Sequence, residues 1–309
     1  MGPPSGARVV IADEVREALG AGRGVVALET TILVHGLPAE DAVKVGTALD
    51  RTVREHGAVP ATVGMVNGVC VVGLALDEVR RLVERRETVR KLSTRDLGLA
   101  AAAGADGATT VAATIALAAG AGVAVMATGG IGGVHHGAAE TFDESADLVA
   151  LSRTPVLVVA SGAKSILDLP ATLERLDTLG VPVAGYRTVT FPGFYVRDSG
   201  VPVAWSVESP EQAAEAFLAH RELSRGGMLL ANPVPEAAEM DPVLHARVLA
   251  DALHDAHESG IGGADVTPFL LAHFASESGG VSVAANVALV LDNAALAARV
   301  AAALATLGS

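Results

Sequence analysis

Short apolar runs alternate with amphipathic segments along almost the whole chain. The apolar runs are rich in Val, Ala, Leu and Met, which is typical of buried strands, and they cover residues 25–28, 61–65, 123–127, 156–160, 181–184 and 228–230. The amphipathic segments have the period of helices and cover residues 40–56, 171–179, 210–223, 242–258 and 281–307. This βα alternation predicts an α/β/α sandwich with a mostly parallel central sheet, folded as a single domain over residues 1–309.

One stretch imitates a membrane span, because residues 107–134 run for 28 positions without a charge. Seven glycines interrupt this stretch, and no Trp, Tyr, Lys or Arg anchors its ends. It divides naturally into a helix, a Gly-Ala-Gly turn, a strand and a Gly-rich loop. We therefore expect a buried α/β unit there, and no membrane as a partner.

Composition narrows the class of protein further. The net charge is −13 and only 3% of the residues are aromatic, which argues against a basic nucleic-acid-binding surface and against stacking platforms for single strands. Cys70 is the sole cysteine, so an internal disulfide and a Cys-based zinc cluster are excluded. The first twenty residues carry acidic groups where a secretory signal needs an apolar run, and we expect a cytoplasmic location.

Lysine is scarce, since only three of the 22 basic residues are lysines: Lys44, Lys91 and Lys164. A surface cation tolerates exchange to arginine, whereas an amine that must lose its proton and attack a carbonyl does not. Lys164 follows an apolar strand, at the edge where α/β enzymes place their sites, and burial there would favour the uncharged amine. Lys91 could bind an anion or form an ordinary salt bridge, and Lys44 has the surroundings of a solvated surface residue.

A Gly-rich segment, residues 127–137, also follows an apolar strand. Its glycines allow backbone N–H groups to approach a ligand, but their spacing matches neither a dinucleotide fingerprint nor a Walker loop. We expect a ligand-facing loop in which His135 or His136 hydrogen-bonds a polar ring. The alternative is that these histidines cap the backbone of the loop.

Three carboxylates stand out by position. Glu29 ends an apolar strand and is either a general acid/base or a strand-end charge facing water. Asp143 and Asp147 are four residues apart and would share a face of a helix, where they suit Mg²⁺ or Mn²⁺ better than zinc. A helix N-cap is the equally good explanation for one of the two.

The stretch 186–203 contains two prolines and two glycines, at positions 192, 193, 200 and 202. It predicts a long irregular excursion, which is either a lid or oligomer contact or a surface loop without a role.

Nine regions of the chain, in order, resemble the pseudouridine-5′-phosphate glycosidase family. They are ALETTI at 27–32 with HGLP at 35–38, GAVPAT at 57–62, STRD at 93–96, GATTVA at 107–112, ATGGIGGVH at 127–135, TFDESAD at 141–147, SGAKSILDL at 161–169, ANPVPE at 231–236 and TPFLL at 267–271.

The resemblance implies a homotrimeric α/β/α enzyme that reversibly joins ribose 5-phosphate to uracil through a carbon–carbon glycosidic bond. Lys164 would form a Schiff base with the ring-opened sugar, Glu29 would move protons, and Asp143 would hold Mn²⁺, with Mg²⁺ as the substitute. The implied substrate-binding residues are Lys91, Val111, Thr128, His135, Ser145, Ala146, Asp147 and Asn286.

The chain departs from the family pattern at three places. It has Glu29-Thr-Thr for the usual Glu-Ser-Thr, His135-His136 for His-Arg, and Gly262-Gly263 for Gly-Lys. If His136 and Gly263 line the base pocket, two long cations are lost there and a larger aromatic polyketide acceptor becomes the alternative to uracil. Drift at positions outside the pocket explains the changes equally well.

Two other classes of protein compete with this interpretation. A carbohydrate kinase would need a Gly-rich anion hole before a catalytic aspartate, of which residues 262–265 are a faint echo. A sugar-phosphate-binding regulator would need the pocket but no reactive amine.

Overall fold

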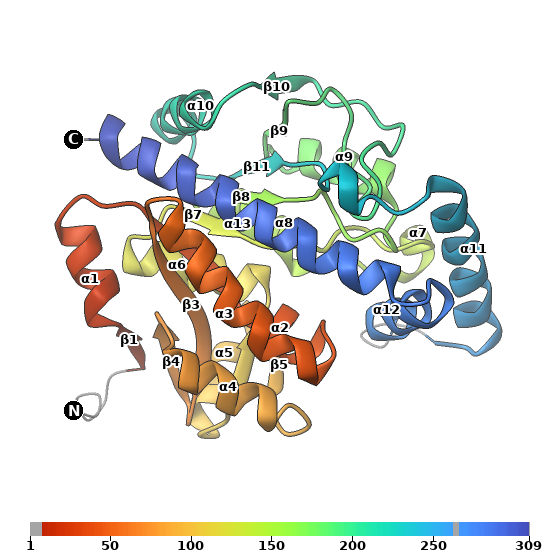
Figure 1. Cartoon of the computed structure of the whole chain (residues 1–309), viewed down its shortest axis with the longest axis horizontal. Coiled ribbons are helices and arrows are strands. Elements are labelled where there is room, and N and C mark those ends of the chain that lie inside the picture. The colour runs from red at the N-terminus through yellow and green to blue at the C-terminus, as the bar shows by residue number, and fades with distance from the viewer. Residues whose placement is uncertain (1–7, 262–265, 309) are drawn as a thin grey trace.

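A computed structural model describes residues 8–261 and 266–308 as one α/β fold (Figure 1). The strands of its central sheet lie in the order β1-β4-β3-β2-β7-β8-β11-β9-β10, and β6 joins at β3 with β5 beyond it. Pairing is parallel except between β3 and β4 and between β3 and β6. The predicted mostly parallel sheet is confirmed.

The strands are short and mostly buried on both faces, as helices on either side require. They are β1 Val9–Ile11, β2 Val25–Glu29, β3 Val59–Val66, β4 Val69–Val72, β5 Arg90–Leu92, β6 Gly107–Thr109, β7 Val125–Ala127, β8 Leu157–Ala160, β9 Val183–Tyr186, β10 Trp205–Val207 and β11 Met228–Ala231. Each of the predicted strands is present, with small differences at the ends.

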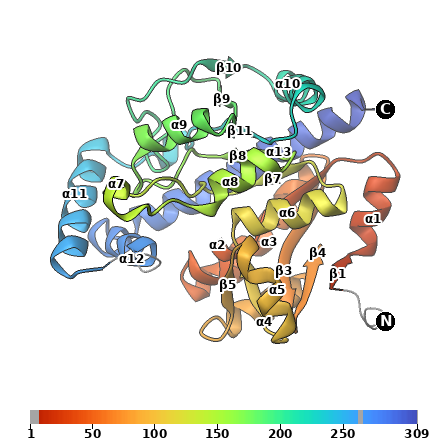
Figure 2. The ribbon, with the colours of Figure 1, turned by 180° about the vertical axis from the view of Figure 1, so that it is seen from behind.

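Helices α3, α10 and α13 cover one face of the sheet (Figure 1), and α6, α8 and α9 cover the other (Figure 2). The helices are α1 Asp13–Gly20, α2 Thr31–His35, α3 Ala39–Glu55, α4 Leu76–Glu84, α5 Leu97–Ala102, α6 Val111–Ala121, α7 Ala138–Thr141, α8 Ala146–Arg153, α9 Leu169–Thr178, α10 Pro210–Leu223, α11 Pro242–Glu258, α12 Val266–Glu277 and α13 Val281–Leu307; two 3₁₀ turns lie at η1 Thr94–Asp96 and η2 Glu236–Ala238. The three layers of the predicted sandwich are therefore present.

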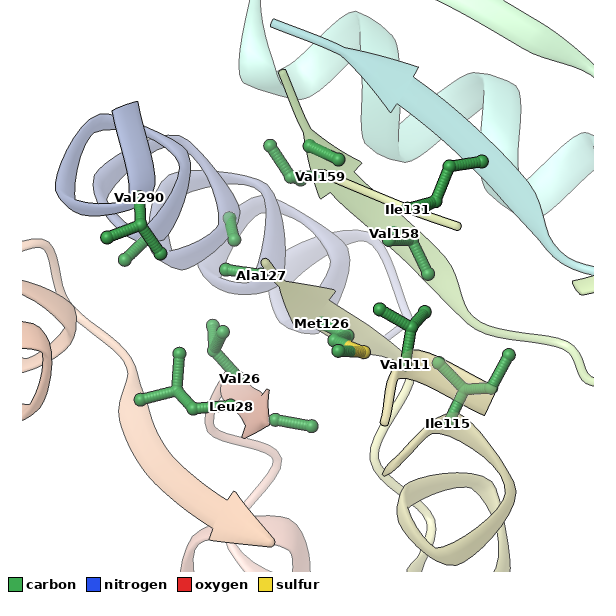
Figure 3. Packing of buried hydrophobic residues seen from close by; sticks show 14 of the residues in the cluster. Val26, Leu28, Val111, Ile115, Met126, Ala127, Ile131, Val158, Val159 and Val290 are labelled. Atoms are coloured by element: carbon green, nitrogen blue, oxygen red, sulfur yellow. The ribbon is translucent and has the colours of Figure 1, made fainter. Parts of the chain in front are cut away.

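The core is built from small aliphatic side chains on both faces of the central strands. Figure 3 shows Val26 and Met126 on β2 and β7, with Ile115 of α6 on one side and Val290 of α13 on the other. Because Ala and Val fill little volume, the helices lie close to the sheet.

The charge-free stretch contains the predicted helix α6, turn with a left-handed Gly122, strand β7 and Gly-rich loop, and the short strand β6 before them was not predicted. Among the described residues, α13 alone has the length and apolarity of a membrane-crossing helix. Thirteen of its residues are buried, and it contacts β2, β7, β8, α3 and α10. The apolar character of α13 is explained by this packing.

The irregular excursion follows β9 and runs to β10, as expected. Its middle is buried rather than solvated, with Phe191, Phe194 and Tyr195 each at most 3% exposed. The middle of the excursion is therefore part of the core, which contradicts its interpretation as a surface loop.

Candidate active site

Two adjoining hollows lie at the carboxyl ends of β2, β7 and β8. The apolar chamber, of about 350 Å³, has Ile32, Gly129, Gly130 and Phe194 in its wall. The polar chamber, of about 470 Å³, is lined by the loops before α6 and α8 and by η1. Four residues line both chambers: Glu29, Thr31, Lys91 and Lys164.

The parallel pairing of β2 with β7 and of β7 with β8 brings together residues that are far apart in the sequence. Glu29 is the last residue of β2, Thr128 follows β7, and Lys164 comes shortly after the end of β8. The predicted strand-end location of Glu29 and Lys164 is therefore correct.

Glu29 is only 6% exposed, so its alternative interpretation as a strand-end charge facing water is wrong. The Thr128 hydroxyl donates a hydrogen bond to its carboxyl group. Burial raises the pKa of Glu29, and the positive charge of Lys164 opposes that shift. A carboxyl group that keeps its proton closer to neutral pH can act as a general acid.

The three lysines differ in their surroundings as the sequence predicted. Lys164 is half-buried where the chambers meet, and Lys91 of β5 faces both of them. Desolvation and the charge of Lys164 lower the pKa of Lys91, and no carboxylate of the described residues forms an ion pair with it. The Lys44 side chain is 77% exposed and lies 3.6 Å from the Asp41 carboxylate, as a surface residue should.

Helices α6 and α8 begin at the polar chamber. Thr110 caps α6 and Ser145 caps α8, so the alternative interpretation, in which an aspartate caps α8, is wrong. The chamber wall also includes Val111, Ala146 and Asp147. Two helix N-termini at one hollow favour a bound anion, because their N–H groups and dipoles are directed toward it.

Asp147 is buried, and its carboxylate accepts hydrogen bonds from the backbone N–H groups of Ala112 and Gly132, each at 2.8 Å. This carboxylate therefore connects α8 to α6 and to the Gly-rich loop. Asp143 lies in the loop before α8, so the two aspartates do not share a helix face as the sequence suggested.

The Asp143 carboxylate lines the polar chamber and has no hydrogen bond or ion pair among residues 8–261 and 266–308. Burial and the charge of Lys164 lower the pKa of the neighbouring His135, while the carboxylate of Asp143 opposes this shift. A neutral imidazole beside an unpartnered carboxylate suits a divalent cation. Within the described part of the chain no three acidic, His or Cys side chains converge on a metal position, so water and substrate oxygens would complete the coordination.

Asn286 of α13 lines the apolar chamber and is 6% exposed. Its side-chain oxygen is buried without a hydrogen-bond partner in the described structure. Leaving a buried acceptor unpaired costs free energy, and a ligand N–H group would relieve that cost.

Several residues of the apolar chamber escaped the sequence analysis. Phe194 comes from the excursion and has a left-handed φ of 66°, which is unusual for a bulky residue. A Cβ atom at Gly130 would lie 2.7 Å from the Phe194 ring, so this glycine is needed for close packing. Arg86 and His35 complete the wall, and desolvation together with the Arg86 charge lowers the pKa of His35.

The structure places two of the three departures from the family pattern, Thr30 and His136. The Thr30 hydroxyl is fully buried, donates to the Val63 carbonyl at 2.8 Å and accepts from the Thr109 N–H at 2.9 Å, so it holds β6 against β3. His136 is exposed and lines neither chamber that Lys164 lines, which contradicts its placement in a base pocket. Gly263 and the kinase-like residues 262–265 lie outside the described residues.

Comparisons with known proteins agree with this geometry. The chain is 57% identical over 290 residues to the pseudouridine-5′-phosphate glycosidase of Salinispora tropica, covering 93% of this chain and 89% of that protein. It is 53% identical to the enzyme of the same name from Saccharopolyspora erythraea, covering 96% and 98%.

Two solved structures share the fold. The crystal structure of the prealnumycin C-glycosynthase AlnA in complex with ribulose 5-phosphate superposes with a TM-score of 0.91 at 38% identity, covering 99% of both chains. An indigoidine synthase A-like protein from Thermotoga maritima superposes with a TM-score of 0.88 at 35% identity, also over 99% of both chains. A sequence model described as indigoidine synthase A like protein matches residues 14–303. The chain therefore belongs to the indigoidine synthase A-like family, together with the pseudouridine-5′-phosphate glycosidases that it resembles.

Proposed function

We propose that this protein is a C-glycosidase that interconverts pseudouridine 5′-phosphate plus water with uracil plus ribose 5-phosphate. The observation that carries the proposal is the placement of Lys164 and the buried Glu29 where the apolar and polar chambers meet. A nucleobase fits the first chamber and a phosphorylated sugar fits the second. The names of the relatives at 48% to 57% identity support the same substrate.

A carbon–carbon glycosidic bond needs an electron sink, because the carbanion of a ring carbon is a poor leaving group. In the synthetic direction the Lys164 amine condenses with C1 of the open-chain sugar, forming an imine and releasing water. C5 of uracil then attacks the protonated imine and afterwards loses its proton. The sugar 4-hydroxyl finally displaces the lysine amine and closes the ring, and cleavage runs through the same steps in reverse.

Glu29 is the group that gives and takes protons in these steps. Its raised pKa lets it hold a proton for donation to a departing oxygen or ring carbon, and Thr128 orients its carboxyl group. The unpaired Asn286 oxygen would accept an N–H of the base, and such a contact distinguishes uracil from an apolar ring.

The polar chamber would hold the phosphorylated ribose. The N-termini of α6 and α8 would supply backbone donors at Val111 and Ala146, and Lys91 supplies a positive charge. Ser145 and Asp147 line the same chamber, but their backbone N–H groups already donate to the Gly133 carbonyl and the Ser145 hydroxyl. Asp143 and His135 would hold Mn²⁺ or Mg²⁺ in the same chamber. When bound, such an ion would orient and polarise substrate oxygens.

A second candidate function is the joining of ribose 5-phosphate to a larger aromatic acceptor. It is favoured by the likeness to a C-glycosynthase and by the apolar wall that Ile32 and Phe194 form. Comparing kcat/KM for pseudouridine 5′-phosphate with that for a panel of aromatic C-ribosides distinguishes the two. Efficient cleavage of pseudouridine 5′-phosphate supports the first function and would exclude the second.

We also propose, from the family resemblance, that the protein is a homotrimer, and, from its single cysteine, that it works in the cytoplasm. Light scattering should then give a particle of three times the chain mass of 31.0 kDa. A monomer in that measurement would remove the trimer from the proposal.

The decisive experiment traps the imine. Wild-type protein is incubated with ribose 5-phosphate and reduced with borohydride, and the adduct is located by mass spectrometry. We expect the sugar on Lys164 and no turnover in Lys164→Arg, because a guanidinium does not lose its proton to become a nucleophile. The exposed Lys44→Arg is the matched control and should behave as wild type. An adduct on Lys44, or none at all, would refute the mechanism.

A further inference from the structure

A buried hydrogen-bond cluster lies beneath the active-site loops and is centred on Asn293 of α13. Asn293 is 0% exposed, and apart from Asp292 its neighbours at positions 290–298 of the helix are Ala, Val and Leu. Burying an amide among apolar groups is unfavourable unless its hydrogen bonds are satisfied. A polar residue at this point therefore requires an explanation beyond packing.

Both the nitrogen and the oxygen of the Asn293 side-chain amide form hydrogen bonds. Its Nδ2 donates to the carbonyl oxygens of Thr128 at 2.9 Å and Gly129 at 3.3 Å, and contacts the Ser161 hydroxyl at 3.1 Å. Its Oδ1 accepts from Nδ2 of Asn232 at 2.9 Å. One side chain thus ties together the segments that follow β7, β8 and β11.

The neighbour Asn232 reinforces this arrangement. It is 5% exposed and also donates to the Asp292 carboxylate at 2.7 Å. Because the Asn232 amide group faces acceptors at 292 and 293, the Oδ1 of Asn293 is held as the acceptor and its Nδ2 is left to face the loops.

Each segment that Asn293 holds carries a part of the site. Thr128 donates to Glu29, Gly129 lines the apolar chamber, and Ser161 lies three residues before Lys164. Asn286 lies seven residues earlier on α13, on the same face of the helix, and reaches the apolar chamber itself. The helix therefore presents one amide to the ligand and a second to the loops around it.

We propose that Asn293 is a positioning residue, which fixes the Thr128 loop so that Thr128 can orient the Glu29 carboxyl group. This inference rests on the proposed function, since it concerns the proton-transfer step. Asn293 lines neither chamber, so its effect on the reaction would be exerted through the loop. Nothing in the family resemblance points to this position, which lies outside the nine regions quoted above.

The test compares Asn293→Leu with Leu296→Ala, a fully buried position three residues along the same helix. Leucine keeps the approximate size of asparagine but removes every hydrogen bond. We expect kcat of folded Asn293→Leu to fall about 10- to 100-fold with little change in KM, because small misplacements of catalytic groups cost rates of that order. Leu296→Ala should lose stability while keeping its kcat.

The pH profile separates positioning from general weakening. Loosening the Thr128 loop removes a hydrogen bond that lowers the pKa of Glu29, so the limb of the kcat profile due to Glu29 should move to higher pH. Thr128→Val should move the limb in the same direction, and the double variant should be less impaired than the product of the single effects. If Asn293→Leu does not fold, Asn232→Ala tests the same cluster and should show the same shift to a smaller degree.

Borohydride trapping keeps the two proposals apart. Lys164 is also held by its N–H bond to the Ile131 carbonyl at 3.1 Å, so Asn293→Leu should still form the imine with ribose 5-phosphate. Failure of the wild type to form the imine counts against the proposed function. A wild type that is trapped and active, with an unchanged kcat and pH profile in Asn293→Leu or Asn232→Ala, would overturn the positioning role alone.

Discussion

At the scale of single residues, burial gives two ordinary side chains properties that a catalytic or binding site can use. Glu29 and Asn286 are each 6% exposed, and both lie where a ligand would reach them. The first is a carboxyl group that favours its proton, and the second is an acceptor without a donor among the described residues. Both arrangements reduce the stability of the fold, which proteins commonly tolerate at functional sites.

The Glu29→Gln substitution tests both the loss of stability caused by burying Glu29 and the catalytic role of this residue. The folded state binds the Glu29 proton more tightly than the unfolded state, so the stability that it contributes is present below its ordinary pKa and is lost as pH rises through the raised value. The Glu29→Gln variant should therefore keep the wild-type melting temperature near pH ~4 and exceed it near pH ~8.

The same substitution should lower kcat by about 10²- to 10⁴-fold, the usual contribution of general acid–base catalysis. Melting curves at the two pH values and steady-state kinetics provide the measurements. A loss of stability at the higher pH would show that ion pairing with Lys164 outweighs the burial of Glu29.

Asp143→Asn tests the metal assignment. Removing the unpartnered carboxylate should weaken Mn²⁺ binding in the presence of ribose 5-phosphate by about tenfold or more. Titration calorimetry measures this directly, and chelation should abolish wild-type turnover until Mn²⁺ is restored. Asp41→Asn on the surface is the control, and equal Mn²⁺ affinity in the two variants would remove Asp143 from the metal site.

Among the secondary-structure elements, helix N-termini and one glycine-rich loop form the polar chamber. Gly132 and Gly133 are required by close packing, since a Cβ atom would lie 2.2 Å from Ser145 and 2.3 Å from Thr172. The loop is therefore pressed against α8 and α9. Asp147 holds this arrangement together by accepting from α6 and from the loop.

Asp147→Ala should destabilise the protein by about 2 to 4 kcal/mol, because two buried N–H groups lose their acceptor. Asp147→Asn retains one acceptor oxygen and should lose roughly half as much. Urea unfolding at neutral pH measures both variants. Equal stability of wild type and Asp147→Ala would mean that water replaces the carboxylate.

At the scale of the whole molecule, helix α13 crosses one face of the central sheet (Figure 1). It packs on β2, β7 and β8 and against α3 and α10. A helix in this position must be apolar along nearly its whole length, which explains its resemblance to a membrane span.

Leu296→Ala should therefore lower the free energy of unfolding by about 2 to 5 kcal/mol, the usual cost of a cavity in a close-packed core. Leu307 on the same helix is 46% exposed, so Leu307→Ala should change stability by less than about 0.5 kcal/mol. Denaturant titrations compare the two, and similar losses would contradict the central position of α13 in the core.

Hydrophobic periodicity and composition were sufficient to predict six of the eleven strands of the described structure, the three layers and the candidacy of Lys164 and Glu29, but not the short strands β1, β4, β5, β6 and β10. These features are local, since periodicity, strand ends and lysine scarcity are properties of neighbouring residues or of composition. Asp143 and Asp147 show the limit, because their spacing suited a helix that in fact begins only at Ala146.

Which distant residues meet became visible only in the folded chain. The order and register of the strands, which include the antiparallel junction of β6 with β3, bring Glu29, Lys91 and Lys164 to one place, and the path of the excursion adds Phe194. Whether Glu29 faces water, and whether Asn293 meets an apolar core or polar groups, depends on contacts between segments up to 165 positions apart. The pattern of hydrophobic residues does not predict which distant segments come into contact, because many chain paths bury the same apolar faces equally well.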